Sequence, residues 1–158
     1  MDTSKLYPPF AAKVNALLAA CLSRGAEYKI TCTVRTPAEQ DKIYAQGRPG
    51  PDGKVVPGGI ISNARGTPPE SMHIFGIAAD FCRIVNGKAV WDRPSYAVLG
   101  EEAKKLGLEW GGLWHFVDIP HVQVPNLRLS SLQAMYAKGG LAEVWHYVDS
   151  LGAKSSRA

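Results

Sequence analysis

Ten glycine and proline residues crowd the 23 positions from 48 to 70, and this stretch limits the possible folds more than any other feature. Proline lacks a backbone N–H and glycine is costly to order, so neither a helix nor a sheet strand is expected to run through it. Unstructured loops of this length are uncommon in compact domains and are often functional. We therefore interpret residues 48–70 as a loop that borders a functional site, with a tolerated surface insertion as the alternative.

Before this loop, the sequence predicts a helix, a strand and a second helix. Residues 8–24 carry apolar side chains at helical spacing, and residues 28–34 alternate between apolar and polar side chains. Thr36 and Glu39 form a capping box with proline at the first helical position, so a second helix is expected to begin there. Arg35 lies at this strand-to-helix junction, a common place for a functional side chain.

After the loop, a hairpin is predicted over residues 77–91, because Asn86-Gly87 is a strong two-residue turn signal. The remaining predicted elements are a helix over 94–106, a strand over 116–124 interrupted by Pro120, and one or two helices over 130–151 around Gly139-Gly140. Strands and helices mix without a regular βαβ alternation. The predicted fold class is therefore α+β, a small antiparallel β-sheet flanked by helices, and the length suits one domain over residues 1–158.

Composition excludes several classes of protein. Hydrophobic residues make up 46% and charged residues 20%, which indicates a globular chain rather than a disordered one. The net charge of +4 is mildly basic, but no nucleic-acid motif accompanies it, so no nucleic-acid partner is expected. We find no signal peptide and no run of about 20 apolar residues, so synthesis in the cytoplasm and no stable membrane association are expected. Cys21, Cys32 and Cys82 are predicted to be buried free thiols, with a metal or catalytic role as the alternative.

Two histidines stand out because each has an acidic residue at short range. His73 precedes Asp80 by seven positions, and His121 follows Asp118 by three. Two imidazoles and one carboxylate make a catalytic zinc ligand set that leaves a fourth position for water, and Asp118 is a spare carboxylate suited to proton transfer. In a regular strand Asp118 and His121 would point to opposite faces, but a bend at Pro120 could bring them together. The alternative is that these histidines are ordinary core or surface residues.

These residues also fall into spaced blocks that carry a family resemblance. The blocks are Arg35-Thr36-Pro37-Ala38-Glu39-Gln40, then Tyr44, Gln46, Gly47 and Arg48, then Ser71, His73, Gly76 and Asp80, and finally Trp110-Gly111-Gly112, Asp118 and His121. In this order they resemble the zinc D-Ala-D-Ala carboxypeptidase family, which includes the L-alanyl-D-glutamate peptidases used by phages as endolysins. The resemblance covers roughly residues 28–124, and the segment from Arg35 to Arg48 is similar to the endolysin branch.

The resemblance implies a role for each of these side chains. The zinc (Zn²⁺) ligands would be His73, Asp80 and His121, at a site on the sheet. Asp118 would be the general base, and Arg35 would steady the substrate or the developing oxyanion. Gln40 and Ser71 would support substrate binding or the geometry of the site.

The function implied is a zinc-dependent peptidoglycan peptidase of the bacteriophage endolysin type. It would hydrolyse the L-alanyl-D-glutamate bond of the stem peptide through a metal-activated water. We expect a monomer without a separate cell-wall-binding domain, made in the host cytoplasm and acting on the periplasmic wall after release. A D,D-carboxypeptidase or D,D-dipeptidase that removes terminal D-alanine is the alternative, and a non-catalytic wall-binding module with structural zinc is a third.

Overall fold

The computed structural model describes residues 2–155, which fall into two compact units. Unit 1 is built from the chain up to Val34 and from Gly76–Asn126. Unit 2 is built from Arg35–Phe75 and from the described residues from Leu127 onward. The chain therefore passes between the units three times, and Arg35 stands at the first of these crossings.

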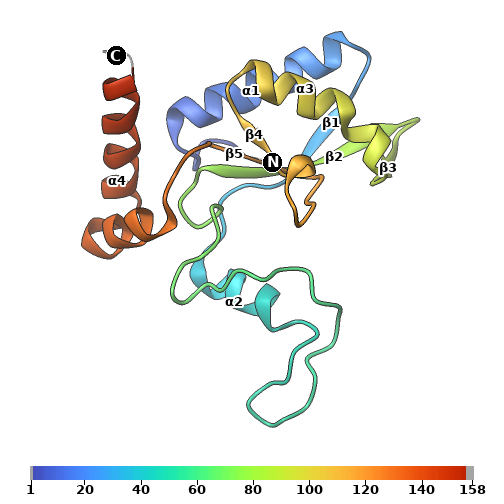
Figure 1. Ribbon diagram of the computed structural model, residues 1–158. Coiled ribbons are helices and arrows are strands. Elements are labelled where there is room, and N and C mark those ends of the chain that lie inside the picture. Colours follow the sequence, from blue (N-terminus) through green and yellow to red (C-terminus); the bar gives the residue numbers. More distant parts are fainter. Residues whose placement is uncertain (1, 156–158) are drawn as a thin grey trace. The chain divides into compact units, whose positions relative to one another are not determined.

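Unit 1 contains an antiparallel sheet of five strands, which confirms the predicted α+β class (Figure 1). The strands are β1 (Tyr28–Cys32), β2 (Ala78–Val85), β3 (Lys88–Val90), β4 (Glu109–Trp110) and β5 (His121–Gln123). Their order is β1-β2-β5-β4, and β3 pairs with the far end of β2. Asn86 and Gly87 both have positive φ, at 50° and 75°, as a tight hairpin turn requires, so the hairpin prediction is confirmed.

Two helices cover one face of this sheet, α1 (Pro8–Ser23) and α3 (Ala97–Lys105), the latter preceded by the short η1 (Arg93–Tyr96) (Figure 1). Both helices bury apolar side chains in the core. Val14 and Leu17 of α1, which are three residues apart and so share a helix face, are fully buried, and so is Leu99 of α3. The buried Tyr96 hydroxyl donates to the Phe81 carbonyl at 3.0 Å and ties this helical layer to β2. Both helices were predicted within a few residues of these bounds.

The last strand is shorter than the sequence predicts. Instead of running over 116–124, β5 begins at His121, because a turn occupies the residues before it. The His121 N–H donates to the Asp118 carbonyl at 3.2 Å, which closes that turn. Pro120 lies inside the turn and has no N–H to offer a neighbouring strand. The predicted bend at Pro120 is therefore real, and it lies just before the strand rather than interrupting it.

Unit 2 begins with α2 (Pro37–Ala45), whose N-terminus has the predicted capping box. Thr36 accepts from the Glu39 N–H at 3.2 Å, and the Glu39 carboxylate accepts from the Thr36 N–H at 2.7 Å. The following residues 48–70 form no helix or named strand, as predicted, and contain one isolated bridge between Pro49 and Val55. This loop is nonetheless tied to α2, because Asp41 accepts from the Gly66 N–H at 2.8 Å.

The rest of unit 2 is α4 (Leu129–Ser155), which is interrupted at Gly139 and Gly140. Gly140 has φ 66° and neither glycine is helical, so α4 is two helices joined at a kink; the sequence had left one or two helices open here. Trp145 donates to the Phe75 carbonyl at 2.9 Å and anchors the second helix within unit 2. Among the described residues, no helix is both long and apolar enough to cross a membrane.

Candidate functional site

A row of polar side chains crosses one face of the unit 1 sheet. Asp80 on β2 pairs with His121 on β5, and Gln123 on β5 pairs with Glu109 on β4. Directly paired residues on neighbouring strands share a face, and so do residues two apart along one strand. All four side chains therefore project from the same face, in three adjacent strands.

Two of the three predicted zinc ligands meet within this row. Asp80 Oδ1 lies 3.1 Å from His121 Nδ1, although 41 residues separate them in the sequence. Both side chains are largely shielded from solvent, with exposures of 19% and 8%. Ligand atoms at about 2.0–2.1 Å from a tetrahedral zinc ion are separated by roughly 3.3 Å, so this pair fits two corners of such a site.

Cys32 extends the row onto β1, where it pairs with Asp80. A bulge at Thr31 shifts the register by one residue and brings Cys32 onto the Asp80 face. The sequence predicts a buried thiol here, but Cys32 is only half-buried, and a thiol is a possible zinc ligand. Cys21 fits the prediction, because burial raises the pKa of its thiol to about 11 and keeps it protonated.

His73 lies in unit 2, in a tight turn just before the chain returns to unit 1. The Ile74 N–H donates to the Ser71 carbonyl at 3.0 Å, and the His73 carbonyl accepts from the Arg35 N–H at 3.3 Å. His73 and Ser71 are both buried. The turn thus fixes the His73 backbone beside Arg35, and the role of His73 as the third zinc ligand stays a prediction.

Asp118 is exposed at the start of the turn that leads into β5. Its N–H donates to the Gly111 carbonyl at 3.0 Å, and that carbonyl also accepts from the Trp114 N–H at 3.2 Å. A Cβ at position 111 would lie 2.5 Å from the Asp118 carbonyl oxygen, so only glycine permits this close approach. Gly111 therefore helps to place Asp118 three residues before His121, within reach of solvent. The predicted role as general base is untested.

Arg35 and Gln40 contact each other in unit 2. Arg35 Nη1 donates to Gln40 Oε1 at 2.6 Å, while Gln40 Nε2 donates to the Ser62 hydroxyl at 3.0 Å and the Ala64 carbonyl at 2.8 Å. Gln40 is fully buried. It therefore orients the Arg35 guanidinium and joins it to the long loop, while direct substrate contact by Gln40 and Ser71 stays a prediction.

Three residues that the sequence did not single out surround His121. Gln123 Oε1 lies 3.0 Å from His121 Nε2, and Gln123 Nε2 donates to Glu109 Oε2 at 3.2 Å. Trp114 Nε1 donates to Glu109 Oε1 at 2.6 Å, and the Trp114 ring lies over the His121 ring with centroids 5.1 Å apart. The two-residue spacing of His121 and Gln123 on a strand was the available signal, but Glu109 required knowledge of the strand pairing.

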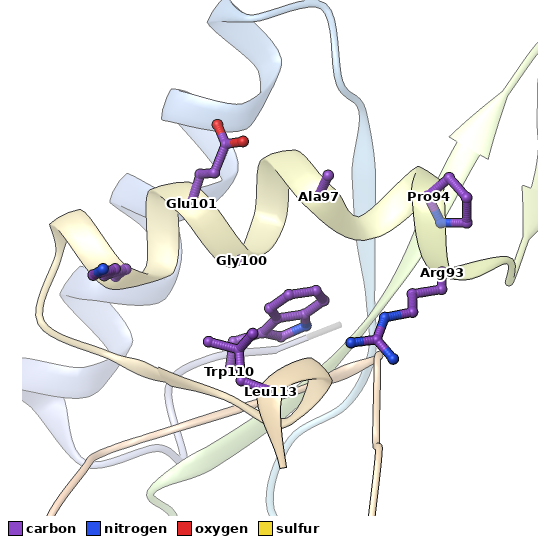
Figure 2. Close-up of a pocket in the computed structure, with 8 residues that line it drawn as sticks. Arg93, Pro94, Ala97, Gly100, Glu101, Trp110 and Leu113 are labelled. Atoms are coloured by element: carbon purple, nitrogen blue, oxygen red, sulfur yellow. The ribbon is translucent and has the colours of Figure 1, made fainter. Parts of the chain in front are cut away.

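A cavity of about 450 Å³ lies on the opposite, helix-covered face of the sheet (Figure 2). It is lined by Arg93, Pro94, Ala97, Gly100, Glu101, Lys104, Trp110 and Leu113. Trp110 pairs with Val122, so its side chain points away from the His121 face. None of the predicted site residues lines this cavity.

Comparison with known proteins agrees with this fold. A family model described as D-alanyl-D-alanine carboxypeptidase, of peptidase family M15, matches residues 65–124. The chain is 36% identical over 135 residues to the peptidoglycan L-alanyl-D-glutamate endopeptidase CwlK of Bacillus subtilis, covering 78% of this chain and 76% of that protein. The crystal structure of the Serratia marcescens L-Ala D-Glu endopeptidase ChiX has a similar fold, with a TM-score of 0.56, 20% identity, and coverage of 77% of this chain and 82% of that one.

Fold and sequence together define a peptidase. The chain belongs to peptidase family M15, which confirms the resemblance drawn from the spaced sequence blocks.

Proposed function

We propose that this protein is a zinc-dependent peptidoglycan peptidase that hydrolyses the L-alanyl-D-glutamate bond of the stem peptide. The observation that carries this proposal is the Asp80–His121 pair, with ligand atoms 3.1 Å apart on one face of the sheet. Membership of the M15 family gives the class of reaction. Both relatives compared above are named as endopeptidases for this bond, which favours it as the scissile bond.

The residues of the chain have distinct tasks in such a reaction. Asp80 and His121, together with His73, would hold the zinc ion. When bound, zinc supplies a Lewis acid that polarises a carbonyl and lowers the pKa of water towards about 7. Asp118, exposed on its turn, would accept a proton from the attacking water and pass it to the leaving amine as the C–N bond breaks. Arg35, oriented by Gln40, would face the developing oxyanion.

The first test is mass spectrometry of defined muropeptides digested by the zinc-loaded protein. New fragments that begin at D-glutamate are expected. The description of the matched family model favours a second candidate, a D,D-carboxypeptidase, for which the product would lack a single terminal D-alanine. Loss of the D-alanyl-D-alanine pair would indicate a D,D-dipeptidase. Activity that survives exhaustive chelation would rule out the zinc mechanism in every case.

Replacing Asp118 separates a peptidase from a binding module with structural zinc. Asp118→Asn keeps the size of the side chain but removes the base, so turnover should fall by about 100-fold or more while zinc stays bound. Asp149→Asn, which changes an exposed carboxylate on α4, is the matched control and should behave as the wild type. Equal turnover in both variants would remove the role assigned to Asp118.

We further propose that the protein acts as a phage endolysin that reaches the wall after release from the host cytoplasm. Support comes from the resemblance of the segment from Arg35 to Arg48 to the endolysin branch. Expression in a Gram-negative host with and without a pore-forming holin tests this. Lysis is expected only when both proteins are present, and lysis without the holin would indicate another route to the wall.

A further inference from the structure

Glu109 anchors a directed chain of hydrogen bonds that ends at His121. It accepts from Trp114 Nε1 at 2.6 Å and from Gln123 Nε2 at 3.2 Å, one bond to each carboxylate oxygen. An indole N–H can only donate and an ionised carboxylate can only accept, so the directions of these bonds are set by chemistry. The NH₂ group of Gln123 therefore points to Glu109 and donates to it.

This hydrogen bond also fixes the direction of the Gln123 carbonyl oxygen. Its carbonyl oxygen Oε1 faces His121 Nε2 at 3.0 Å, inside a buried pair with 7–8% exposure. A carbonyl oxygen only accepts, so Nε2 must carry a hydrogen. A flipped Gln123 would instead press its carbonyl oxygen against the Glu109 carboxylate, which is unfavourable because both groups are acceptors.

A neutral His121 ring with hydrogen on Nε2 has its lone pair on Nδ1, which lies 3.1 Å from Asp80 Oδ1. In the metal-free ring a hydrogen on Nδ1 can fill this gap and donate to Asp80, whereas a bound divalent ion would take its place and leave the hydrogen on Nε2. We propose that Glu109 and Gln123 are positioning residues that keep a hydrogen on His121 Nε2 and so present Nδ1 to the metal. The identity of the ion as zinc rests on the proposed function, whereas the hydrogen on Nε2 does not.

Trp114 also restricts the movement of the His121 ring by packing against it. Its ring covers His121 at a centroid distance of 5.1 Å and an interplanar angle of 48°. Because Trp114 is itself bonded to Glu109, one carboxylate holds both the ring that covers His121 and the amide that orients it. Removing the Glu109 carboxylate should therefore free the His121 ring twice over: Trp114 loses the bond that holds it against the ring, and Gln123 loses the bond that orients it.

Glu109→Gln is the variant that tests this, because it keeps the size of the side chain but supplies an amide donor. Gln123 is then free to turn, so His121 should populate the Nδ1–H tautomer as well. In metal-free protein, the ¹⁵N shifts of His121 report directly whether Nε2 carries a hydrogen. Loss of an outer hydrogen-bond partner should weaken zinc binding by about 10–100-fold, measured by competition with a chelator.

Glu27→Gln is the matched control, since it removes the same charge from an exposed carboxylate of the same unit. It should leave the ¹⁵N spectrum and the zinc affinity unchanged. Gln123→Leu gives an independent test should Glu109→Gln fail to fold, because it removes the acceptor for Nε2–H directly. In the double variant, Glu109→Gln should add less loss than it causes alone, because only its bond to Trp114 is left to remove.

Three results would overturn the proposal: an Nε2 without hydrogen in the wild type, wild-type zinc affinity in Glu109→Gln, or fully additive losses in the double variant. A wild-type protein that binds no zinc would contradict the proposed function instead. The ¹⁵N measurement on metal-free protein would still decide the role of Glu109 and Gln123 in that case.

Discussion

Gly111→Ala should reduce turnover far more than it reduces zinc binding. A Cβ at this position would lie 2.5 Å from the Asp118 carbonyl oxygen, whereas ordinary contacts begin at 3.4 Å, so the two segments must separate by roughly 0.9 Å. Both segments are backbone and cannot yield by a rotamer change. Overpacking of this kind costs about 1–3 kcal/mol of unfolding free energy. A misplacement of about 1 Å in a catalytic group can cost about 100-fold in rate.

The assay is steady-state cleavage of a defined muropeptide, together with zinc affinity and thermal melting of each variant. We expect kcat to fall by about 100-fold, with zinc affinity close to that of the wild type. Gly152→Ala is the control, because a Cβ there meets nothing within 4 Å on the exposed surface of α4. A Gly111→Ala protein that melts at a lower temperature yet keeps the wild-type kcat would refute the reasoning, since the position of Asp118 would then not limit the reaction.

Two further predictions concern stability in unit 1. Gly100→Ala would place a Cβ 2.2 Å from the Trp110 ring, so we expect about 3 kcal/mol less unfolding free energy in urea denaturation; an unchanged midpoint would show that the ring can move. Hydrogen bonds from Lys105 and Arg24 hold the pKa of Glu102 below its usual value of 4.5, so their stabilisation is present above about pH 4.5 and is lost as the pH falls through the lower folded pKa. Metal-free Glu102→Gln should therefore lose less thermal stability than the wild type on acidification from about pH 5 to pH 3, and parallel losses would contradict this.

The parts of the fold that sequence predicted well are those fixed by neighbouring residues. The capping box at Thr36 and Glu39 requires only four consecutive residues, and the structure shows both of its hydrogen bonds. The Asn86-Gly87 turn likewise depends on residues that adopt positive φ at low cost. Such caps and turns can be predicted from the sequence, because the residues that form them are neighbours in the chain and need no contact with a distant segment.

The site required information that local patterns do not contain. Asp80 meets His121 across 41 residues only because β2 and β5 pair in one register, and the spaced family blocks rather than periodicity pointed to that meeting. Cys32 reaches the row only through the bulge at Thr31, which alternation along the strand could not reveal. Glu109 lies on a strand of two residues, too short to show any pattern.

The register of β5 serves the core and the site together. Val122 is fully buried and pairs with Ala79 and Trp110 on the helix-covered face, while His121 and Gln123 flank it on the other face. The Trp110 indole also donates to the Ile119 carbonyl at 2.8 Å and so fixes the backbone just before the strand. A slip of one residue would exchange the faces and put Val122 where His121 meets Asp80. Apolar packing on one face therefore fixes the Asp80–His121 geometry on the other, and we expect substitutions around Trp110 to weaken the proposed metal site without touching its ligands.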